Sequence, residues 1–369
     1  MVQVARKLKS DNVLFVATIL MVCASVVMVY SASANKALDL YEDPYFFLIR
    51  QGLWAVLGVA VLYVTMRIDY RTYRNGPLIW ALLGVVAVLL IAALFSKEVN
   101  GAHRWVGFSM LKFQPSELAK IVCVLFTAMM LERRMHRIND ISYSLLPIGI
   151  VASALAALIA VEPDAGTTLS LLAVVGVMVF AAGLNYRYMV TVAAVAVPLL
   201  LVYVMSEDYR VERVQAFWDP WEYRQGKGWQ IIQSFLAVGS GGIFGRGLNE
   251  SVQKLFFLPE PHTDFIYSVI GEEFGLIGTT TVLLCFCLIV WRGLSIATKA
   301  EDRFGSLVAL GLTMMIGLQA FVNISVVLGL LPTKGIPLPL LSSGGSSLLV
   351  SLLGIGILLN ISQHKSADA

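Results

Sequence analysis

The feature that most constrains this chain is a series of apolar runs, each about as long as a membrane is thick. A hydrocarbon core of about 30 Å needs about 20 apolar residues in a helix. Ten such runs predict helices near 12–33, 46–66, 77–95, 115–131, 143–161, 167–184, 188–206, 264–291, 304–330 and 343–361. Only 14% of the residues are charged, against roughly 25% in soluble domains. We therefore expect one all-α polytopic membrane domain, residues 1–369, with ten transmembrane helices.

The basic residues of the connections predict the orientation of the chain, because cytoplasmic loops carry an excess of Lys and Arg. With the N-terminus inside, the segments that face the cytoplasm carry 14 Lys and Arg residues, and the short outer loops carry 5. With the N-terminus outside, the excess of Lys and Arg would fall on the extracytoplasmic side instead. Both termini are therefore expected in the cytoplasm. The small net charge of +3 gives no indication of a nucleic-acid partner.

Residues 207–263 do not fit a simple bundle. They form a long extracytoplasmic connection between the seventh and eighth helices, rich in glycine, tryptophan and charge. Connections this long inside a compact fold are usually functional or disordered. Aromatic side chains that prefer the membrane interface argue against disorder here. We expect a short amphipathic helix from Gln230 to Val238 within this connection.

Ionisable residues at membrane depth are costly and often mark a site. Glu117 and Lys120 stand three apart in the fourth helix and therefore share one face. They form either a structural ion pair or part of a polar cavity open to the outside. Asp164 lies in a short outer turn behind Glu162 and Pro163. Capping of the next helix is its simplest role, and cation binding by the two carboxylates is the alternative.

Asp264 lies where the long connection meets the eighth helix. It is either a helix cap, favoured by the helix dipole, or a general base whose pKa is raised by partial desolvation. His262 either assists it or is simply solvated. The glycine-rich run 239–247 matches no nucleotide-binding fingerprint, although its backbone would suit a phosphate. Basic residues of the same connection would suit a pyrophosphate or lipid headgroups: Arg210, Arg213, Arg246 and Lys254.

The last outer loop, residues 331–347, is apolar but broken by three prolines. Irregular backbone at membrane depth is stable only where it is buried in protein or lines a wet cavity. Together with the ionisable residues, this loop predicts an outward-facing polar cavity. Such a cavity would serve an enzyme that acts on a lipid-linked anion, or a transporter of one.

Motifs along nearly the whole chain resemble the SEDS family of cell-wall polymerases, in the family's order and on its ten-helix plan. The motifs are Gly101-Ala102-His103-Arg104-Trp105, Phe113 to Lys120, Pro163-Asp164 with Gly166-Thr167-Thr168, Tyr209-Arg210 through Arg213 to Asp219-Pro220, Gly228 to Gly247, Leu258 to Ile266, Gly271 to Gly275, and Pro337-Leu338-Pro339 with Ser342 and Gly344 to Ser347.

The resemblance implies a glycosyltransferase that polymerises lipid II into glycan strands outside the membrane. In this family the 4-hydroxyl of one lipid-linked disaccharide attacks the anomeric carbon of the growing strand with inversion, and undecaprenyl pyrophosphate leaves. The family's essential aspartate corresponds to Asp264, as general base. The resemblance places Glu117 and Lys120 in the same cavity and makes Arg210 and Arg213 ligands of the pyrophosphate. Further cavity residues are expected at Arg104, Asp164, Arg246, His262, Lys334 and Ser342.

A divalent cation, Mg²⁺ or Mn²⁺, would help to neutralise the leaving group, but the sequence shows no ligand set for it. The resemblance implies a class B penicillin-binding protein, a transpeptidase, as partner, beside other membrane proteins of the division machinery. Leu331 to Gly335 resembles the division-type branch of the family (FtsW) more than the elongation-type branch (RodA), and sporulation members share the pattern. The expected location is the bacterial cytoplasmic membrane at the division septum, with the active site outside.

Two other functions are weaker alternatives for a chain with these motifs. A lipid II flippase would need polar sites at the bilayer midplane and repeat symmetry, and neither is visible in the sequence. A division scaffold without catalysis would have little use for charged residues such as Glu117 and Lys120 within the membrane.

Overall fold

The computed structural model describes residues 10–96, 103–107, 112–255 and 257–364. The N-terminal basic residues and Gly101-Ala102 of the first motif lie outside these ranges. Within the described part every named element is helical, and extended pairing is confined to an isolated bridge between Val106 and Phe113.

The helices of the described residues are α1 (Asn12–Tyr41), α2 (Phe46–Thr65), α3 (Gly76–Leu94), α4 (Pro115–Arg134), α5 (Leu146–Val161), α6 (Ala165–Ala181), α7 (Tyr186–Met205), α8 (Asp208–Trp218), α9 (Gly228–Ser240), α10 (Ile266–Lys299), α11 (Arg303–Val327) and α12 (Gly345–Ser362). Seven helical stretches of the described residues are long and apolar enough to cross a membrane: α1, α2, α3, α5 with the preceding turn from Ile141, α10, α11 and α12. Helix α6 is apolar but shorter. The expected count of ten spans and the expected orientation stay predictions.

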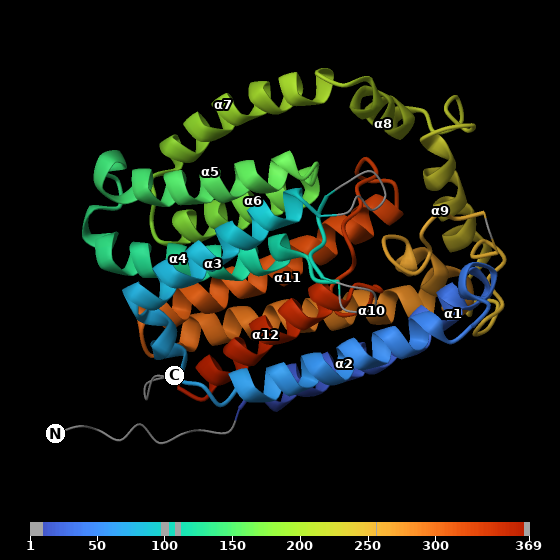
Figure 1. The fold of residues 1–369 in the computed structure, drawn as a ribbon, viewed down its shortest axis with the longest axis horizontal. Helices are drawn as coiled ribbons and strands as arrows, with labels where there is room; N and C mark the ends of the chain where they lie inside the picture. The colour runs from blue at the N-terminus through green and yellow to red at the C-terminus, as the bar shows by residue number, and fades with distance from the viewer. Residues whose placement is uncertain (1–9, 97–102, 108–111, 256, 365–369) are drawn as a thin grey trace.

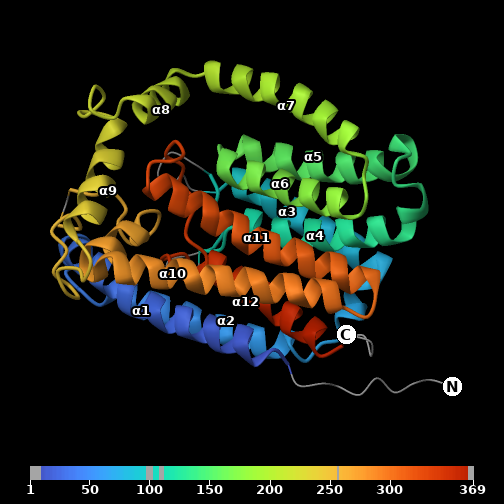
Figure 2. The same ribbon diagram turned by 180° about the vertical axis from the view of Figure 1, so that it is seen from behind.

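Helices α4, α11 and α12 form the centre of the bundle, because nearly every side chain of α4 and α12 is buried. The backbone N–H of Asp11 donates to Oγ of Ser362 at 3.0 Å. The start of α1 and the end of α12 therefore lie side by side. In both views α7 arches away from the bundle, and α9 stands across the end of the bundle at which α1 finishes (Figures 1 and 2).

The long connection contains two helices. The one expected from Gln230 to Val238 is confirmed within α9, whereas α8 was not expected. Helix α9 is fixed to the bundle through Ser234, whose hydroxyl contacts Oγ of Ser268 and donates to O of Val327, both at 2.7 Å. The connection is thus folded onto α10 and α11.

The glycine-rich run 239–247 packs against a break in α10. The break lies at Gly275, where φ is +63°. The N–H groups of Arg246 and Gly247 donate to the carbonyls of Glu272 and Glu273, both at 3.0 Å. These two N–H groups are therefore used inside the protein, and the expected phosphate-binding role of this backbone finds no support in them. The glycines allow two stretches of backbone to come into direct contact.

We expect Gly245→Ala to lower the melting temperature of the detergent-solubilised protein, corresponding to about 1–3 kcal/mol of backbone strain and displacement. Gly245 has a φ of +81°, and a Cβ there would lie 2.1 Å from the carbonyl oxygen of Glu273. Gly239 is the matched control, since no atom lies within 4 Å of its Cβ position. Equal melting temperatures for the Gly245→Ala and Gly239→Ala proteins would contradict this account of the packing.

Candidate active site

A cavity of about 710 Å³ opens between the starts of α4, α6 and α12, helix α8, the end of the long connection and the last outer loop. Ligand sites commonly have volumes of about 300–1,000 Å³. Seven of the residues that we expected in the site line this cavity: Arg104, Glu117, Asp164, Arg210, Arg213, Asp264 and Lys334. Residues distant in the sequence are therefore brought together in one polar site.

Glu117 and Lys120 form a buried ion pair at the start of α4. Nζ of Lys120 donates to Oε1 of Glu117 at 2.9 Å and to Oε1 of Gln319, on α11, at 2.8 Å. Nε2 of Gln319 donates in turn to O of Pro337 at 3.0 Å. Only Glu117 of the pair lines the cavity. The pair thus has a structural role, because it ties α4 and α11 to the last outer loop.

Asp164 caps α6, as the simpler interpretation of the sequence predicted. Oδ1 of Asp164 accepts the N–H of Thr167 at 3.0 Å, and Oδ2 accepts its hydroxyl at 2.9 Å. Nε2 of Gln114 also donates to Oδ2, at 3.1 Å. Arg104 donates to the carbonyls of Glu162 and Pro163 and so holds the turn before Asp164. Both side chains shape the cavity wall through these bonds.

Asp264 is not the cap of α10, since that helix begins at Ile266 behind Phe265. The backbone of Asp264 is fixed from α11, where Nδ2 of Asn323 donates to its carbonyl oxygen at 2.8 Å. The carboxylate faces Gly335 of the last outer loop: a Cβ at Gly335 would lie 3.1 Å from Oδ2. Burial, reinforced by the nearby negative charge of Glu260, raises the pKa of Asp264 to about 7.

The carboxylate of Asp264 differs from the other three on the cavity wall in its hydrogen bonding. Those of Glu117 and Asp164 are held as described above, and Oε1 of Glu260 accepts Nζ of Lys36 at 2.8 Å. Within the described part of the chain, no donor reaches the carboxylate of Asp264. A carboxylate with a raised pKa and no donor is suited to accept a proton from a ligand in the cavity.

His262 is neither solvated nor on the cavity wall, so the expectation of a solvated loop histidine is wrong. Its side chain is buried, and its ring packs on that of Phe47 with centroids 4.6 Å apart. Burial lowers the pKa of His262 to about 4.

Ser342 is also buried and does not line the cavity, contrary to its expected place there. Its hydroxyl donates to O of Thr263 and accepts the N–H of Leu338 at 2.8 Å. Ser342 therefore positions the segment before Asp264.

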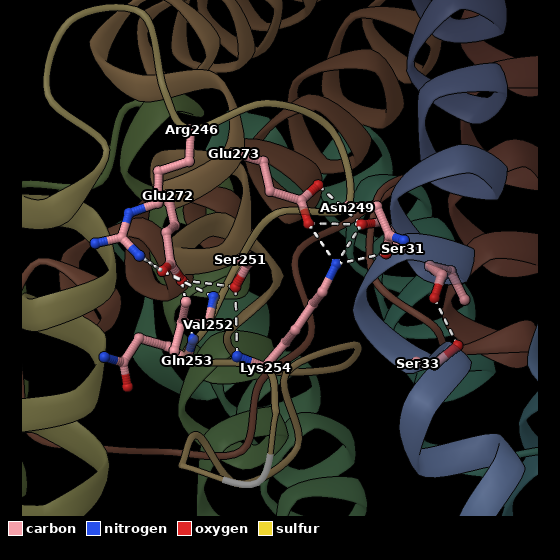
Figure 3. Close-up of polar contacts among 11 residues, drawn as sticks. Ser31, Ser33, Arg246, Asn249, Ser251, Val252, Gln253, Lys254, Glu272 and Glu273 are labelled. Carbon is pink, nitrogen blue, oxygen red and sulfur yellow. Dashed lines mark hydrogen bonds and ion pairs between the residues drawn. The ribbon is translucent and has the colours of Figure 1, made fainter.

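Lys254 is buried in an ion pair and does not line the cavity, contrary to its expected place in a pyrophosphate site. Figure 3 shows its Nζ between three acceptors: Oε1 of Glu273 at 2.7 Å, Oγ of Ser31 at 3.0 Å and Oδ1 of Asn249 at 2.7 Å. These partners come from α10, from α1 and from the long connection itself. The pair therefore fastens the connection to two helices.

Glu272 holds the same segment beside this pair. Its Oε2 accepts the hydroxyl of Ser251 at 2.6 Å, and its Oε1 accepts the N–H of Val252 at 3.0 Å (Figure 3). Arg246 lies 3.4 Å from Oε1 of Glu272 and is 42% exposed. Arg246 does not line the cavity either, so its expected role as a cavity residue finds no support in its position.

The basic side chains of the cavity wall come from two elements, α8 and the last outer loop. Arg210 and Arg213 belong to α8, and Lys334 belongs to the loop. Burial and the nearby charge of Arg213 lower the pKa of Lys334. The described residues contain no group of three or more His, Cys, Asp or Glu that would hold a metal ion. The wall therefore suits an anion better than a metal ion bound by protein ligands alone.

The sequence did not single out Gln319 and Asn323, which both position the site. They stand four apart in the apolar helix α11 and so lie on one face. Nδ2 of Asn323 donates to O of Ile336 at 2.8 Å as well as to Asp264. Two amides at this spacing in an apolar span are a sequence signal that would have identified them.

We expect Lys254→Met to destabilise the protein by about 3–5 kcal/mol, because it leaves the buried carboxylate of Glu273 without its cation. The control is Lys36→Met, since the pair of Lys36 with Glu260 is 32% and 40% exposed and such surface pairs contribute about 0–1 kcal/mol. Thermal unfolding in the same detergent compares the two variants. The expectation is wrong if Lys254→Met melts no earlier than Lys36→Met.

Known proteins are similar to this one along nearly its whole length. Residues 11–367 match the profile of a family described as "Cell cycle protein", which unites FtsW, RodA and SpoVE. The "Probable peptidoglycan glycosyltransferase FtsW" of Geobacter metallireducens is 44% identical over 354 residues, which cover 95% of this chain and 94% of that protein. "Stage V sporulation protein E" of Bacillus subtilis is 40% identical, over 98% of this chain and 99% of that protein.

A solved structure has the same fold. It is described as "Structural coordination of polymerization and crosslinking by a peptidoglycan synthase complex", and one of its chains superposes with a TM-score of 0.79 at 32% identity, over 98% of this chain and all of that one. The seven apolar helices and these matches agree with a multi-pass membrane protein. The chain belongs to the FtsW, RodA and SpoVE family, the SEDS family that its motifs predicted.

Proposed function

We propose that this protein polymerises lipid II into glycan strands on the outer face of the cytoplasmic membrane, with Asp264 as the general base. Its family and relatives named as probable peptidoglycan glycosyltransferases make it a peptidoglycan glycosyltransferase by class. The observation that carries the mechanism is the carboxylate of Asp264. It lines the cavity, its pKa is raised to about 7, and no described residue donates to it.

The proposed reaction joins two lipid-linked sugars. The 4-hydroxyl oxygen of the acceptor forms a bond to the anomeric carbon of the growing strand, and its proton passes to the carboxylate of Asp264. The bond between the anomeric carbon and the pyrophosphate oxygen breaks on the opposite face, and undecaprenyl pyrophosphate leaves with the bonding electrons. Attack and departure on opposite faces invert the anomeric centre. The attacking hydroxyl needs a proton acceptor within hydrogen-bond reach, and Asp264 is the group assigned to this role.

Arg210, Arg213 and Lys334 are the groups we assign to the leaving pyrophosphate. Fixed cations act most strongly where negative charge develops in the transition state, and a partly desolvated cavity strengthens their effect. Mg²⁺ is commonly held by one or two carboxylates together with substrate phosphates. Because the described residues show no ligand set, no step of this proposal depends on Mg²⁺ or Mn²⁺.

The proposed placement in the membrane has ten spans, both termini in the cytoplasm and the cavity outside. An even number of spans is supported by the contact between Asp11 and Ser362, which brings the start of α1 beside the end of α12. Helix α12 begins at the cavity wall and ends at this contact. The cavity therefore lies at the start of α12, and the first and last residues of the helical part of the chain meet at its other end.

A class B penicillin-binding protein is the proposed partner, in a division complex at the septum. The partner is supported by the similarity to a chain of a peptidoglycan synthase complex whose description joins polymerization and crosslinking. The division role is supported by relatives named FtsW. A RodA-like elongation role and a sporulation role are the alternatives within the family, and the similarity to a sporulation protein supports the second of these.

We expect Asp264→Asn to lower the rate of lipid II polymerisation at least about a hundredfold, because it removes a general base. The assay uses labelled lipid II and the full chain purified with its transpeptidase partner, and gel electrophoresis measures the glycan strands. Asp39→Asn is the control, since Asp39 is exposed near the outer end of α1. Normal polymerisation by Asp264→Asn would overturn the assignment. Proteoliposomes that translocate lipid II without making polymer would favour the flippase.

We expect kcat/KM to rise with pH through about 7, because protonated Asp264 cannot accept the proton of the hydroxyl. The nearby charge of Glu260 raises this pKa, so Glu260→Gln should move the midpoint to lower pH. Glu162→Gln is the control: burial raises the pKa of Glu162 to about 8, but Glu162 does not line the cavity. A midpoint that moves in Glu162→Gln but not in Glu260→Gln would contradict the assignment.

A further inference from the structure

The start of α12 forms part of the cavity wall and holds several donors without acceptors. Gly344, Ser346 and Ser347 line the cavity there. The hydroxyls of Ser346 and Ser347 have no hydrogen-bond partner among the described residues, although these residues are only 1% and 6% exposed. Buried hydroxyls in this state are rare, because each loses its hydration without compensation. Two adjacent ones on a cavity wall point to a ligand.

The backbone at this point adds further donors. The N-cap of α12 is Gly344, which offers no side chain to cap the helix. The first N–H of α12 with an acceptor is that of Leu348, which donates to O of Gly344 at 2.9 Å. Within the described residues the N–H groups of Gly345, Ser346 and Ser347 have none. An uncapped helix N-terminus also carries partial positive charge, which favours an anion.

The start of α12 has free space on its side at Gly344, whereas its side at Gly345 packs against α2. A Cβ at Gly344 would meet only the side chain of Ser347, at 3.6 Å. A Cβ at Gly345 would lie 2.2 Å from the indole of Trp54, so this glycine allows α12 to pack on α2. The donors therefore have room for a ligand on the cavity side only.

The helix end is hydrogen-bonded to the segment just before the proposed base. The N–H of Ser343 donates to O of His262 at 2.8 Å, two residues before Asp264. The basic wall also adjoins Asp264, since Gly335, which follows Lys334, lies against its carboxylate. One base is thus accompanied by two anion-binding walls, one made of cations and one made of neutral donors.

We propose that the N-terminus of α12, with the hydroxyls of Ser346 and Ser347, binds the pyrophosphate of the acceptor, the lipid-linked sugar that keeps its pyrophosphate. This inference rests on the proposed function, in which two lipid pyrophosphates are present at once and only one departs. Cationic side chains accelerate the reaction most when they contact the leaving group, because negative charge develops there in the transition state. Neutral donors suffice for a pyrophosphate whose charge does not change.

Ser347→Asp tests the site without removing the helix. Ser347 is the third residue of α12, where an acidic side chain favours helix formation but repels a phosphate. We expect this variant, with an unchanged melting temperature, to lose roughly tenfold or more in affinity at one of two undecaprenyl pyrophosphate sites, the effect of one lost charge-assisted hydrogen bond. The other site, formed by Arg210, Arg213 and Lys334, should keep its affinity. The double variant Ser346→Ala/Ser347→Ala should show the same loss. Ser351→Ala, one turn further along α12 and away from the cavity wall, is the control.

Binding is measured on the full chain carrying Asp264→Asn, so that no turnover occurs, in nanodiscs of neutral lipid. Undecaprenol serves as the probe that lacks phosphate, and phosphatidylglycerol serves as a competing headgroup. The proposal predicts that Ser347→Asp weakens only the binding of undecaprenyl pyrophosphate. Equal binding by Ser347→Asp and Ser351→Ala overturns it. Equal competition by phosphatidylglycerol also overturns it, because the site would then recognise membrane headgroups.

Kinetics distinguish this inference from the proposed function. In the polymerisation assay, Ser347→Asp should raise KM for lipid II about tenfold with kcat within about twofold, as expected when uniform binding is lost. If the wild-type protein polymerises lipid II and Ser347→Asp does so with an unchanged KM, the inference fails and the function stands. If the wild-type protein makes no polymer, the function fails, and the binding experiment still decides whether α12 binds pyrophosphate.

Discussion

The buried ion pair of Lys254 with Glu273 is the interaction that holds the long connection, whose end forms part of the cavity wall, against α10. Burying two charges costs several kcal/mol per ion unless partners compensate, and Lys254 has three acceptors, including one on α1. The contact fixes the long connection ten residues before Asp264. Ser342 and Asn323 fix the residues nearest the carboxylate. Asp264 is therefore held from several helices, although it lies in a segment without regular secondary structure.

The cavity has complementary groups that remain unsatisfied within the protein. One carboxylate, that of Asp264, has no donor among the described residues, and the start of α12 has donors without acceptors. A ligand that carries both a hydroxyl and a pyrophosphate would satisfy both sets at once. A lipid-linked sugar is such a ligand. The remaining cavity carboxylates are used to hold the wall, so the structure separates groups that build the site from groups available for chemistry.

Local patterns in the sequence predicted local features well. The spacing of Glu117 and Lys120 predicted their shared face, and the position of Asp164 predicted a cap. Ion pairs between residues distant in the sequence could not be predicted, because nothing next to a basic residue indicates which distant carboxylate it will contact. Lys254 and Arg246 were therefore assigned to a phosphate site, whereas they meet Glu273 and Glu272 on α10. The break at Gly275 was missed as well, because the glycine run that packs against it lies in another part of the sequence.

Burial beside the cavity raises the pKa of Asp264 to about 7, and the role of Asp264 as general base depends on this value. Infrared difference spectroscopy of the wild-type protein, with the Asp264→Asn protein as reference, measures the carboxyl stretch of this side chain as pH changes. The account predicts that the protonated band disappears with a midpoint near pH 7. A midpoint near 4, the ordinary value for an aspartate in water, would contradict it.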